Sequence, residues 1–233
     1  MAALKLVGGL YGGRKLAAPP NGTRPTAQRT REALFNMLEH APWSPWATGD
    51  GLEGAIVLDG FAGTGALGIE ALSRGADHAT FMDQAPAAFS ALKANSHALD
   101  LGERARLLRI DATRPPRCTT KPATLVLLDP PYLKGLVPRA LKGLARQGWL
   151  APGALIVAET ENLPPTPVPA SDSVPGAERP PLKRDKNGRL IVPPPPALPS
   201  GITPLLQRAF GAALLTIWRH DPLPPPEASA GQT

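Results

Sequence analysis

From about residue 54 to residue 161, short apolar runs alternate with longer segments in which apolar residues recur every three or four positions. Short runs rich in branched side chains are typical of buried parallel strands, and the longer segments are typical of amphipathic helices. A repeated strand–helix order of this kind predicts an α/β fold with a mostly parallel sheet. The expected strands are 55–59, 79–83, 105–110, 124–129 and 154–159, and the expected helices are 66–74, 87–99 and 137–147.

The N-terminal 40 residues predict a smaller structural unit. The short segments 4–7 and 14–16 flank two glycine pairs, a pattern typical of a short glycine-rich β-hairpin. Thr26 is placed to cap the N-terminus of a following helix, on which apolar residues recur at helical spacing as far as Leu38. We therefore treat residues 1–40 as one unit and residues 41–220 as the main domain.

The composition changes toward the C-terminus. Residues 164–226 contain 17 of the 30 prolines of the chain, which predicts loop or polyproline conformation rather than packed elements. We interpret residues 164–200 as an insertion in the main domain and residues 221–233 as a disordered tail. Between them, the runs 205–210 and 213–219 predict an antiparallel hairpin at a sheet edge.

The bulk composition limits the class of protein. Apolar residues make up 42% of the 233 residues and the mean hydropathy is -0.11, values typical of a soluble globular protein. No window approaches the ~20 apolar residues of a membrane span. Cys118 is the only cysteine and no metal-ligand spacing surrounds it, so we expect neither a disulfide nor a metal site. These features favour a reducing, cytoplasmic setting.

The positive charge is concentrated at the N-terminus. The first 31 residues contain six basic side chains and no acidic one, which equals the whole formal net charge of +6. A basic segment on a neutral body is typical of a protein that binds a polyanion, although a solvated surface segment would have the same composition. The basic residues are Lys5, Arg14, Lys15, Arg24, Arg29 and Arg31.

Four aspartates stand at the ends of four successive predicted strands. The carboxyl ends of parallel strands meet at one edge of a sheet, where open α/β folds bind their ligands. The first aspartate precedes a glycine-rich loop that matches the dinucleotide pattern G-x-G-x-x-G, which by itself is a weak signal. An acid at this point would repel a pyrophosphate and attract an amino group. The four aspartates are Asp59, Asp83, Asp111 and Asp129.

A ligand with an adenosine, an amino group and no phosphate accounts for all four of these acids. Asp59 would bind the amino group, Asp83 the ribose hydroxyls and Asp111 the adenine amino group. We therefore predict S-adenosylmethionine as the cofactor. The residues expected to bind it are Asp59, Phe61, Ala62, Gly63, Thr64, Gly65, Leu67, Asp83, Gln84, Asp111 and Ala112.

The tetrapeptide from Asp129 to Tyr132 predicts methyl transfer to nitrogen. The nitrogen of an aromatic amine is a poor nucleophile because its lone pair is delocalised. The carboxylate of Asp129 and the carbonyl of Pro130 can accept both of its N–H bonds and help it become tetrahedral. Two prolines stiffen the turn, and Tyr132 offers a flat face on which a base can stack. The tetrapeptide resembles the signature of enzymes that methylate an exocyclic amino group on a planar base.

Taken together, these motifs resemble those of the RsmD-like family, the bacterial 16S rRNA guanine-N2 methyltransferases. The similarity extends over most of residues 4–161 and again over residues 205–219. In two places the chain departs from the family, since Gly12 stands where an arginine is usual and Asp83 replaces a more common glutamate. The resemblance is carried by Gly8-Gly9, Gly13-Arg14-Lys15-Leu16, Arg24-Pro25-Thr26, the segment from Arg31 to Asn36, the loop and helix from Phe61 to Gly75, and Asp129-Pro130-Pro131-Tyr132.

The resemblance implies a Rossmann-like class I methyltransferase fold, with a seven-stranded, mostly parallel sheet, an antiparallel last strand and an RNA-binding N-terminal β-hairpin. It implies methylation of the N2 amino group of one guanine in 16S rRNA, within the small ribosomal subunit or an assembly intermediate, with S-adenosylhomocysteine as the second product. We expect a monomer that does not contact membranes. The catalytic residues would be Asp129, Pro130 and Tyr132, and the RNA contacts would come from Arg14, Lys15, Arg24, Thr26, Arg29 and Arg31.

Three alternatives stay open at the level of sequence. A DNA adenine-N6 methyltransferase shares the tetrapeptide but usually has a substantial recognition region, which the proline-rich insertion does not resemble. A glutamine-side-chain methyltransferase usually carries asparagine in place of Asp129. A non-catalytic RNA-binding assembly factor would not need an acid at every strand end.

Overall fold

The computed structural model describes residues 4–18, 25–132, 134–161 and 198–221, so the predicted tail beyond Asp221 and most of the predicted insertion lie outside the described residues. The helices are α1 (Pro25–His40), α2 (Ala66–Ser73), α3 (Pro86–Ala98) and α4 (Leu136–Arg146), with a short 3-10 helix, η1 (Gly102–Arg104). The strands are β1 (Ile56–Gly60), β2 (His78–Met82), β3 (Ala105–Leu108), β4 (Ala123–Leu128), β5 (Leu150–Glu161), β6 (Ile202–Phe210) and β7 (Ala213–His220).

Every strand and helix that the hydrophobic pattern of the main domain predicts is present. The largest difference in length concerns β5, which begins at Leu150 rather than near residue 154. Pro152 and Gly153 lie in the first part of this strand. The register between β4 and β5 shifts between Ala123 and Leu125, and this irregularity accommodates both residues within one strand.

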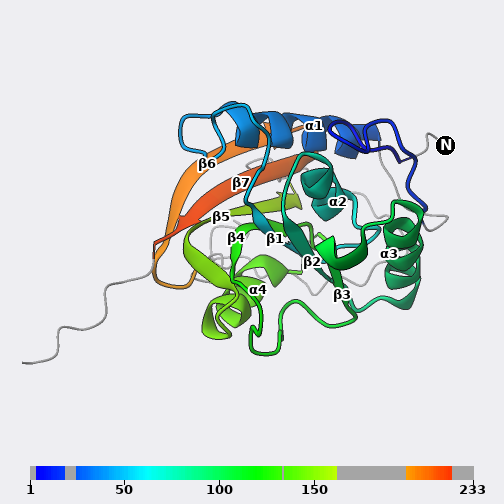
Figure 1. Cartoon of the computed structure of the whole chain (residues 1–233). Helices are drawn as coiled ribbons and strands as arrows, with labels where there is room; N and C mark the ends of the chain where they lie inside the picture. The colour runs from blue at the N-terminus through cyan, green and yellow to red at the C-terminus, as the bar shows by residue number, and fades with distance from the viewer. Residues whose placement is uncertain (1–3, 19–24, 133, 162–197, 222–233) are drawn as a thin grey trace, which may run out of the picture.

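The seven strands form one sheet in the order β3-β2-β1-β4-β5-β7-β6 (Figure 1). The first five strands pair in parallel, whereas β7 is antiparallel to both of its neighbours, β5 and β6. The strand order reverses between β1 and β4, and in open α/β sheets this is the point where ligands bind, at the carboxyl ends of the strands. The prediction of a seven-stranded, mostly parallel sheet with an antiparallel last strand is confirmed.

Alternating side chains of the central strands enter two separate hydrophobic cores. On β4, Leu125 and Leu127 pack with α1, α2 and α3, whereas Val126 and Leu128 pack with α4. Side chains of a strand point alternately to the two faces of a sheet, which gives the molecule three layers (Figure 1). By the same alternation, Asp59 on β1 points to the face that α1, α2 and α3 cover.

The N-terminal segment turns back on itself, but within residues 4–18 it forms only one β-bridge, between Lys5 and Lys15. The N–H of Leu6 donates to the carbonyl of Arg14 at 3.0 Å, and the N–H of Gly13 donates to the carbonyl of Leu6 at 2.9 Å. The predicted hairpin is therefore present as a turn with irregular arms. Its arms are irregular because backbone groups near the turn bond to α2 instead of to each other.

Two side chains of α2, Glu70 and Ser73, form hydrogen bonds with the backbone of the hairpin. The buried carboxylate of Glu70 accepts the N–H groups of Val7 at 2.7 Å and of Gly8 at 2.8 Å. The hydroxyl of Ser73 donates to the carbonyl of Gly8. A Cβ on Gly9 would lie 1.9 Å from the carbonyl oxygen of Ser73, so only glycine allows this close approach. The hairpin therefore packs against the main domain as part of one core.

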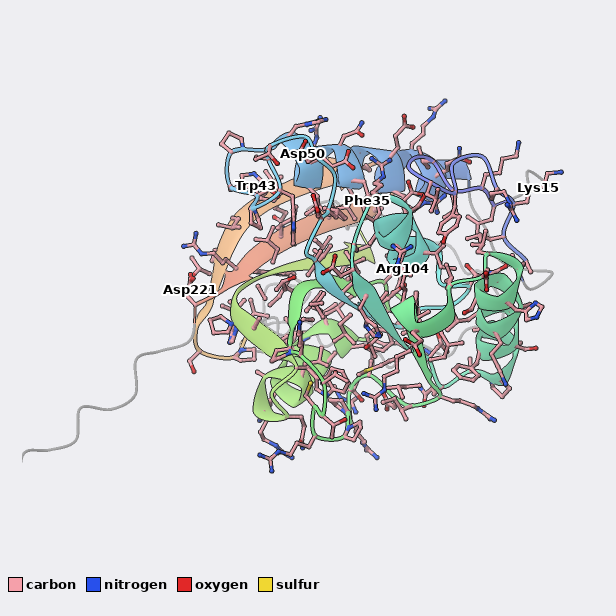
Figure 2. The ribbon with its side chains drawn as sticks, viewed as in Figure 1. Lys15, Phe35, Trp43, Asp50, Arg104 and Asp221 are labelled. Carbon is pink, nitrogen blue, oxygen red and sulfur yellow. The ribbon has the colours of Figure 1, made fainter. Side chains whose placement is uncertain are left out.

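An ion-pair network joins α1 to the same helix. Arg74, which follows α2, donates to Glu70 at 2.9 Å and to Glu39 of α1 at 2.8 Å. Its guanidinium carbon lies 5.2 Å from the centre of the ring of Phe35, a fully buried residue of α1 that Figure 2 labels. Leu34 and Leu38 of α1 belong to the same hydrophobic cluster as the residues of α2 and the sheet. Residues 4–18 and 28–40 are thus continuous with the main domain in their packing.

Helix α1 begins at Pro25, one residue before the predicted cap. Proline suits the first helical position, because the N–H that it lacks would have no intrahelical partner there. Thr26 lies within the first turn, so it is not the N-cap residue that we predicted.

Replacing Glu70 with alanine should destabilise the fold by about 3–5 kcal/mol, because Arg74 and the N–H groups of Val7 and Gly8 would lose their buried acceptor. Urea unfolding followed by circular dichroism measures the change. The control is Glu53→Ala at an exposed position, which should change the free energy of unfolding by less than about 0.5 kcal/mol. A loss no larger than that of the control would contradict this account of how the hairpin docks.

Candidate active site

A pocket of about 910 Å³ opens at the carboxyl ends of β1, β2, β4 and β5. Its wall includes every residue predicted to bind the cofactor except Gly65, and all three predicted catalytic residues, Asp129, Pro130 and Tyr132. The reversal of strand order between β1 and β4 is where an open α/β sheet places such a pocket. The structure thus brings the predicted residues together, and their individual roles stay predictions.

Asp59 lies in the wall of the pocket and is 1% exposed. Its Oδ2 accepts the N–H of Gly68 in α2 at 2.8 Å, whereas its Oδ1 has no hydrogen-bond partner among the described residues. Burial raises the pKa of Asp59 to about 8; the bond from Gly68 lowers it, and the charges of Asp129 and Asp83 raise it. A buried acceptor without a donor is suited to a ligand that carries a charged amino group.

The loop between β1 and α2 uses backbone conformations that favour glycine. Gly63 and Gly65 have φ values of +57° and +83°. A Cβ on Gly65 would lie 2.5 Å from the side chain of Leu92 in α3, so Gly65 lets the loop pack closely against α3 and does not line the pocket. Phe61 also has a positive φ, +64°, which is uncommon for a bulky residue and occurs preferentially at functional sites.

Asp83 and Asp111 are held by backbone groups beside the ends of β2 and β3. The two carboxylate oxygens of Asp83 accept the N–H groups of Gly63 and Ala85, each at 2.8 Å. Oδ1 of Asp111 accepts both the N–H and the hydroxyl of Thr113, each at 2.8 Å. Both carboxylates are half-buried and line the pocket. Because a carboxylate oxygen has two lone pairs, these bonds orient the groups and leave capacity for ligand donors.

Asp129 follows β4 and is exposed to the pocket, and Pro130 beside it is buried. Although the side chain of Asp129 is accessible from the pocket, the surrounding protein shields it from bulk water. This desolvation, and to a lesser extent the charge of Glu159, raises the pKa of Asp129 to about 7. Tyr132 is half-buried, and its hydroxyl donates to Oε1 of Glu159 at 2.9 Å. The ring of Tyr132 therefore lies in the pocket wall with its hydroxyl held in place.

Glu159 in the pocket wall and Asn95, which supports the glycine loop, were not predicted from the sequence. Glu159 follows an apolar run on β5 just as the four aspartates follow theirs, so the same signal could have identified it. Asn95 on α3 is buried; its amide accepts the N–H of Ala17 at 2.7 Å and donates to the carbonyl of Thr64 at 2.9 Å. Asn95 joins the N-terminal segment to the glycine loop, and no local pattern in the sequence points to it.

The predicted RNA contacts include three exposed basic side chains. Lys15 and Arg29 are exposed, and so is Arg14, whose guanidinium donates to the carbonyl of Ala98 at 3.2 Å. These three residues stay available as phosphate contacts. They come from the hairpin and from the first half of α1.

Arg31 has a different environment and is 4% exposed. Its guanidinium donates to the carbonyl of Lys5, and its Nε lies 3.7 Å from Oε2 of Glu70. This burial leaves almost no surface for a phosphate, so the prediction of an RNA contact from Arg31 is wrong. The side chain instead links α1 to the N-terminal segment. Arg24 and the side chain of Thr26 lie outside the described residues.

Two general features concern only the residues that the structure describes. Within them, no group of three or more histidine, cysteine or acidic side chains could hold a metal ion. No helix in this part of the chain is long and apolar enough to cross a membrane.

All the residues that line the pocket except Leu215 lie within a segment that known proteins share. The family model described as Conserved hypothetical protein 95 matches residues 4–171. Ribosomal RNA small subunit methyltransferase D of Escherichia coli K12 is 40% identical over 159 residues, which cover 68% of this chain and 75% of that protein. The Haemophilus influenzae protein of the same name is 36% identical over 171 residues, with coverage of 71% and 83%. The solved structure of yhhF from Escherichia coli is 28% identical, has a TM-score of 0.67, and covers 94% of this chain and 99% of that one.

Asp59→Asn should stabilise the ligand-free protein at pH 8. The pKa of Asp59 is about 8 in the folded protein, against about 4 in an unfolded chain. The folded state therefore keeps a proton that the unfolded state releases, and this group lowers stability progressively as the pH rises from about 4 to 8. Asparagine cannot ionise and can still accept the N–H of Gly68, so we expect a gain of about 2 kcal/mol or more at pH 8.

Urea unfolding between pH 5 and pH 8 measures this effect, with Asp50→Asn at an exposed position as the control (Figure 2). The pKa of Asp129 is also raised, to about 7, so Asp129 makes the free energy of unfolding fall with rising pH in the wild type and in Asp59→Asn alike. Asp59→Asn should therefore lose part of the wild-type slope. An unchanged slope would show that Asp59 is already ionised in the folded protein at neutral pH.

Proposed function

Because the chain belongs to the family of ribosomal RNA small subunit methyltransferase D, we propose that it transfers a methyl group from S-adenosylmethionine to the N2 amino group of a guanine in 16S rRNA. The observation that carries the proposal is one pocket whose wall contains the turn from Asp129 to Tyr132 and also Asp59, whose Oδ1 has no hydrogen-bond partner in the described part of the chain. The substrate would be the small ribosomal subunit or an assembly intermediate. The enzyme would act as a monomer in the cytoplasm.

The residues of the pocket fit S-adenosylmethionine. An ammonium group beside Asp59 would give Oδ1 the donor that it lacks, and would supply the opposite charge that a buried carboxylate requires. Asp83 would accept the ribose hydroxyls and Asp111 the adenine amino group, since backbone N–H groups already orient both carboxylates. When bound, the cofactor supplies an electrophilic methyl group on a sulfonium sulfur.

Three residues would prepare the target nitrogen on the substrate side of the pocket. Asp129 and the carbonyl of Pro130 would accept its two N–H groups and aim its lone pair at the methyl group. The ring of Tyr132, with its hydroxyl held by Glu159, would stack on the base. The nitrogen must lose a proton as it gains the methyl group, and Asp129, with a pKa of about 7, is suited to accept that proton.

Two other functions are less consistent with the molecule. A DNA adenine-N6 methyltransferase shares the tetrapeptide, but the described residues form only the sheet, the helices that cover it and the N-terminal segment, with no further unit to read a DNA sequence. A non-catalytic assembly factor would have no reason to keep a buried carboxylate oxygen without a partner, because such a group costs stability.

A methylation assay with four substrates tests the proposed function. The protein is incubated with methyl-labelled S-adenosylmethionine and with small subunits, naked 16S rRNA, large subunits or double-stranded DNA. We expect label in N2-methylguanosine of 16S rRNA, identified after nuclease digestion. Label in N6-methyladenine of DNA would favour the first alternative, and absence of label from all four substrates would favour the second.

Asp129→Ala should lower the rate of methyl transfer by about 100-fold or more, because the target nitrogen would lose an acceptor for its N–H and for its proton. The affinity for S-adenosylhomocysteine should change only a few-fold, since Asp59, Asp83 and Asp111 remain. Label incorporation measures the first quantity and calorimetry the second. Asp50→Ala, at an exposed position, is the control for both. A rate near that of the wild type would refute the role of the Asp129 carboxylate.

We further propose that Arg14, Lys15 and Arg29, together with Arg24 and Thr26, hold phosphates of the RNA. Lys15→Ala and Arg29→Ala should each weaken RNA binding several-fold near 0.1 M salt, and should each lower the slope of log K against log salt by about 1. Filter binding over a salt series measures both quantities.

The control for this series is Arg219→Ala, which removes one exposed positive charge elsewhere on the molecule. Arg219 pairs with Asp221, and Figure 2 places Asp221 and Lys15 at opposite ends of the molecule. If all three variants bind RNA with the wild-type salt dependence, the N-terminal segment does not hold phosphates.

A further inference from the structure

Glu159 lies beside Asp129 at the same edge of the sheet. Leu128 and Ala158 are register partners on the parallel strands β4 and β5, so Asp129 and Glu159 follow them on strands about 4.8 Å apart. Val157, two residues before Glu159, packs in the core beneath α1, α2 and α3, and the alternation of side chains turns Glu159 to that same face. Both acidic side chains line the pocket.

Glu159 is an acceptor held in a fixed position. Its Oε1 accepts the hydroxyl of Tyr132 at 2.9 Å, and its side chain is half-buried. Its charge is close enough to Asp129 to raise the pKa of that carboxyl group. A carboxylate can accept about four hydrogen bonds, so the bond from Tyr132 is compatible with a further donor from a ligand. Asp129 and Glu159 therefore present two neighbouring acceptor groups to the pocket.

We propose that Glu159 and Asp129 together select guanine, by accepting the adjacent N1–H and N2–H groups of its Watson–Crick edge. This inference rests on the proposed function and assigns base specificity to a residue outside the tetrapeptide. Adenine and cytosine each carry a lone pair beside their amino group, which a carboxylate repels, and uracil has no amino group. Among the four RNA bases, only guanine places two donors side by side, one of them on the nitrogen that receives the methyl group.

A purely structural role for Glu159 would be to orient the ring of Tyr132, and the two roles differ in their response to removal of the charge. Glutamine at position 159 keeps an acceptor oxygen for the hydroxyl of Tyr132, and its amide group can donate to a lone pair at N1. The structural role predicts an unchanged preference among bases. The selective role predicts that the preference for a base with N1–H becomes weaker.

The test compares two RNAs that differ at one base. The guanine mapped in the methylation assay is replaced by 2-aminopurine, which keeps the N2 amino group but carries a lone pair in place of N1–H. We expect the wild-type kcat/KM to favour guanine by about 100-fold or more, because a site built for a donor rejects the analogue that lacks it. Glu159→Gln should narrow this preference about 10-fold or more, with a loss on guanine and a gain on 2-aminopurine.

Tyr132→Phe is the matched control, since it removes the hydroxyl that bonds to Glu159 and keeps the aromatic ring. Even if Tyr132→Phe lowers the rate of methyl transfer, the ratio of kcat/KM on the guanine RNA to that on the 2-aminopurine RNA should stay at the wild-type value. An unchanged preference in Glu159→Gln, or an equal narrowing in Tyr132→Phe, overturns the inference and leaves the proposed function intact. If the wild type does not methylate the guanine RNA, the proposed function fails, and the inference fails with it.

A second variant keeps the test decisive if Glu159→Gln does not fold, as judged by urea unfolding. Glu159→Asp retains the carboxylate but shortens the side chain by one methylene group, so the carboxylate lies farther from the base. It should lower kcat/KM on the guanine RNA about 10-fold or more without raising it on the 2-aminopurine RNA, because a small displacement of a positioning group is costly. A wild-type value on the guanine RNA would overturn the inference.

Discussion

The hydrogen bond from Gly68 to the buried carboxylate of Asp59 is the constraint on which the site depends. It joins β1 to the first turn of α2 at 2.8 Å. The helix lies so close to the sheet that a Cβ on Gly68 would be 2.4 Å from the ring of Phe81. This approach fixes the glycine loop and leaves the second oxygen of Asp59 buried without a hydrogen-bond partner among the described residues. Such an arrangement costs stability in the empty protein, and a cationic ligand would recover that free energy on binding.

The same helix also holds the N-terminal segment. Two residues after Gly68, Glu70 accepts the backbone N–H groups of the hairpin. Asn95 makes a second connection, since its amide bonds to Ala17 on one side and to the carbonyl of Thr64 in the glycine loop on the other. The exposed basic side chains and the pocket therefore belong to one packed unit. The proposed enzyme would need this arrangement, because the side chains that hold the RNA backbone must stay at a constant distance from the pocket in which the base reacts.

Features that follow from the local spacing of apolar residues could be predicted from the sequence. Features that depend on contacts between residues far apart in the sequence could not. Asp59, Asp83, Asp111 and Asp129 were found because the ends of parallel strands converge whatever their order. Glu159 follows the same rule, but its importance depends on β5 lying next to β4, and the sequence does not reveal strand order. The error on Arg31 and the irregular hairpin have one cause, which is Glu70. The N–H groups that donate to Glu70 belong to Val7 and Gly8, 63 and 62 positions away, and no local sequence pattern predicts these hydrogen bonds.

The acids of the pocket act on one another, and in the proposed enzyme this coupling would connect cofactor binding to catalysis. The charge of Asp129 raises the pKa of Asp59, and the charge of Glu159 raises the pKa of Asp129. A positive ligand beside these groups has the opposite effect, so Asp129 would ionise and become a pure acceptor when a sulfonium lies nearby. A protonated Asp129 would present a donor to an amino group that needs acceptors. Methyl transfer would move the positive charge from the sulfur to the target nitrogen beside Asp129, and that nitrogen would then release a proton to the carboxylate, which would leave both groups neutral.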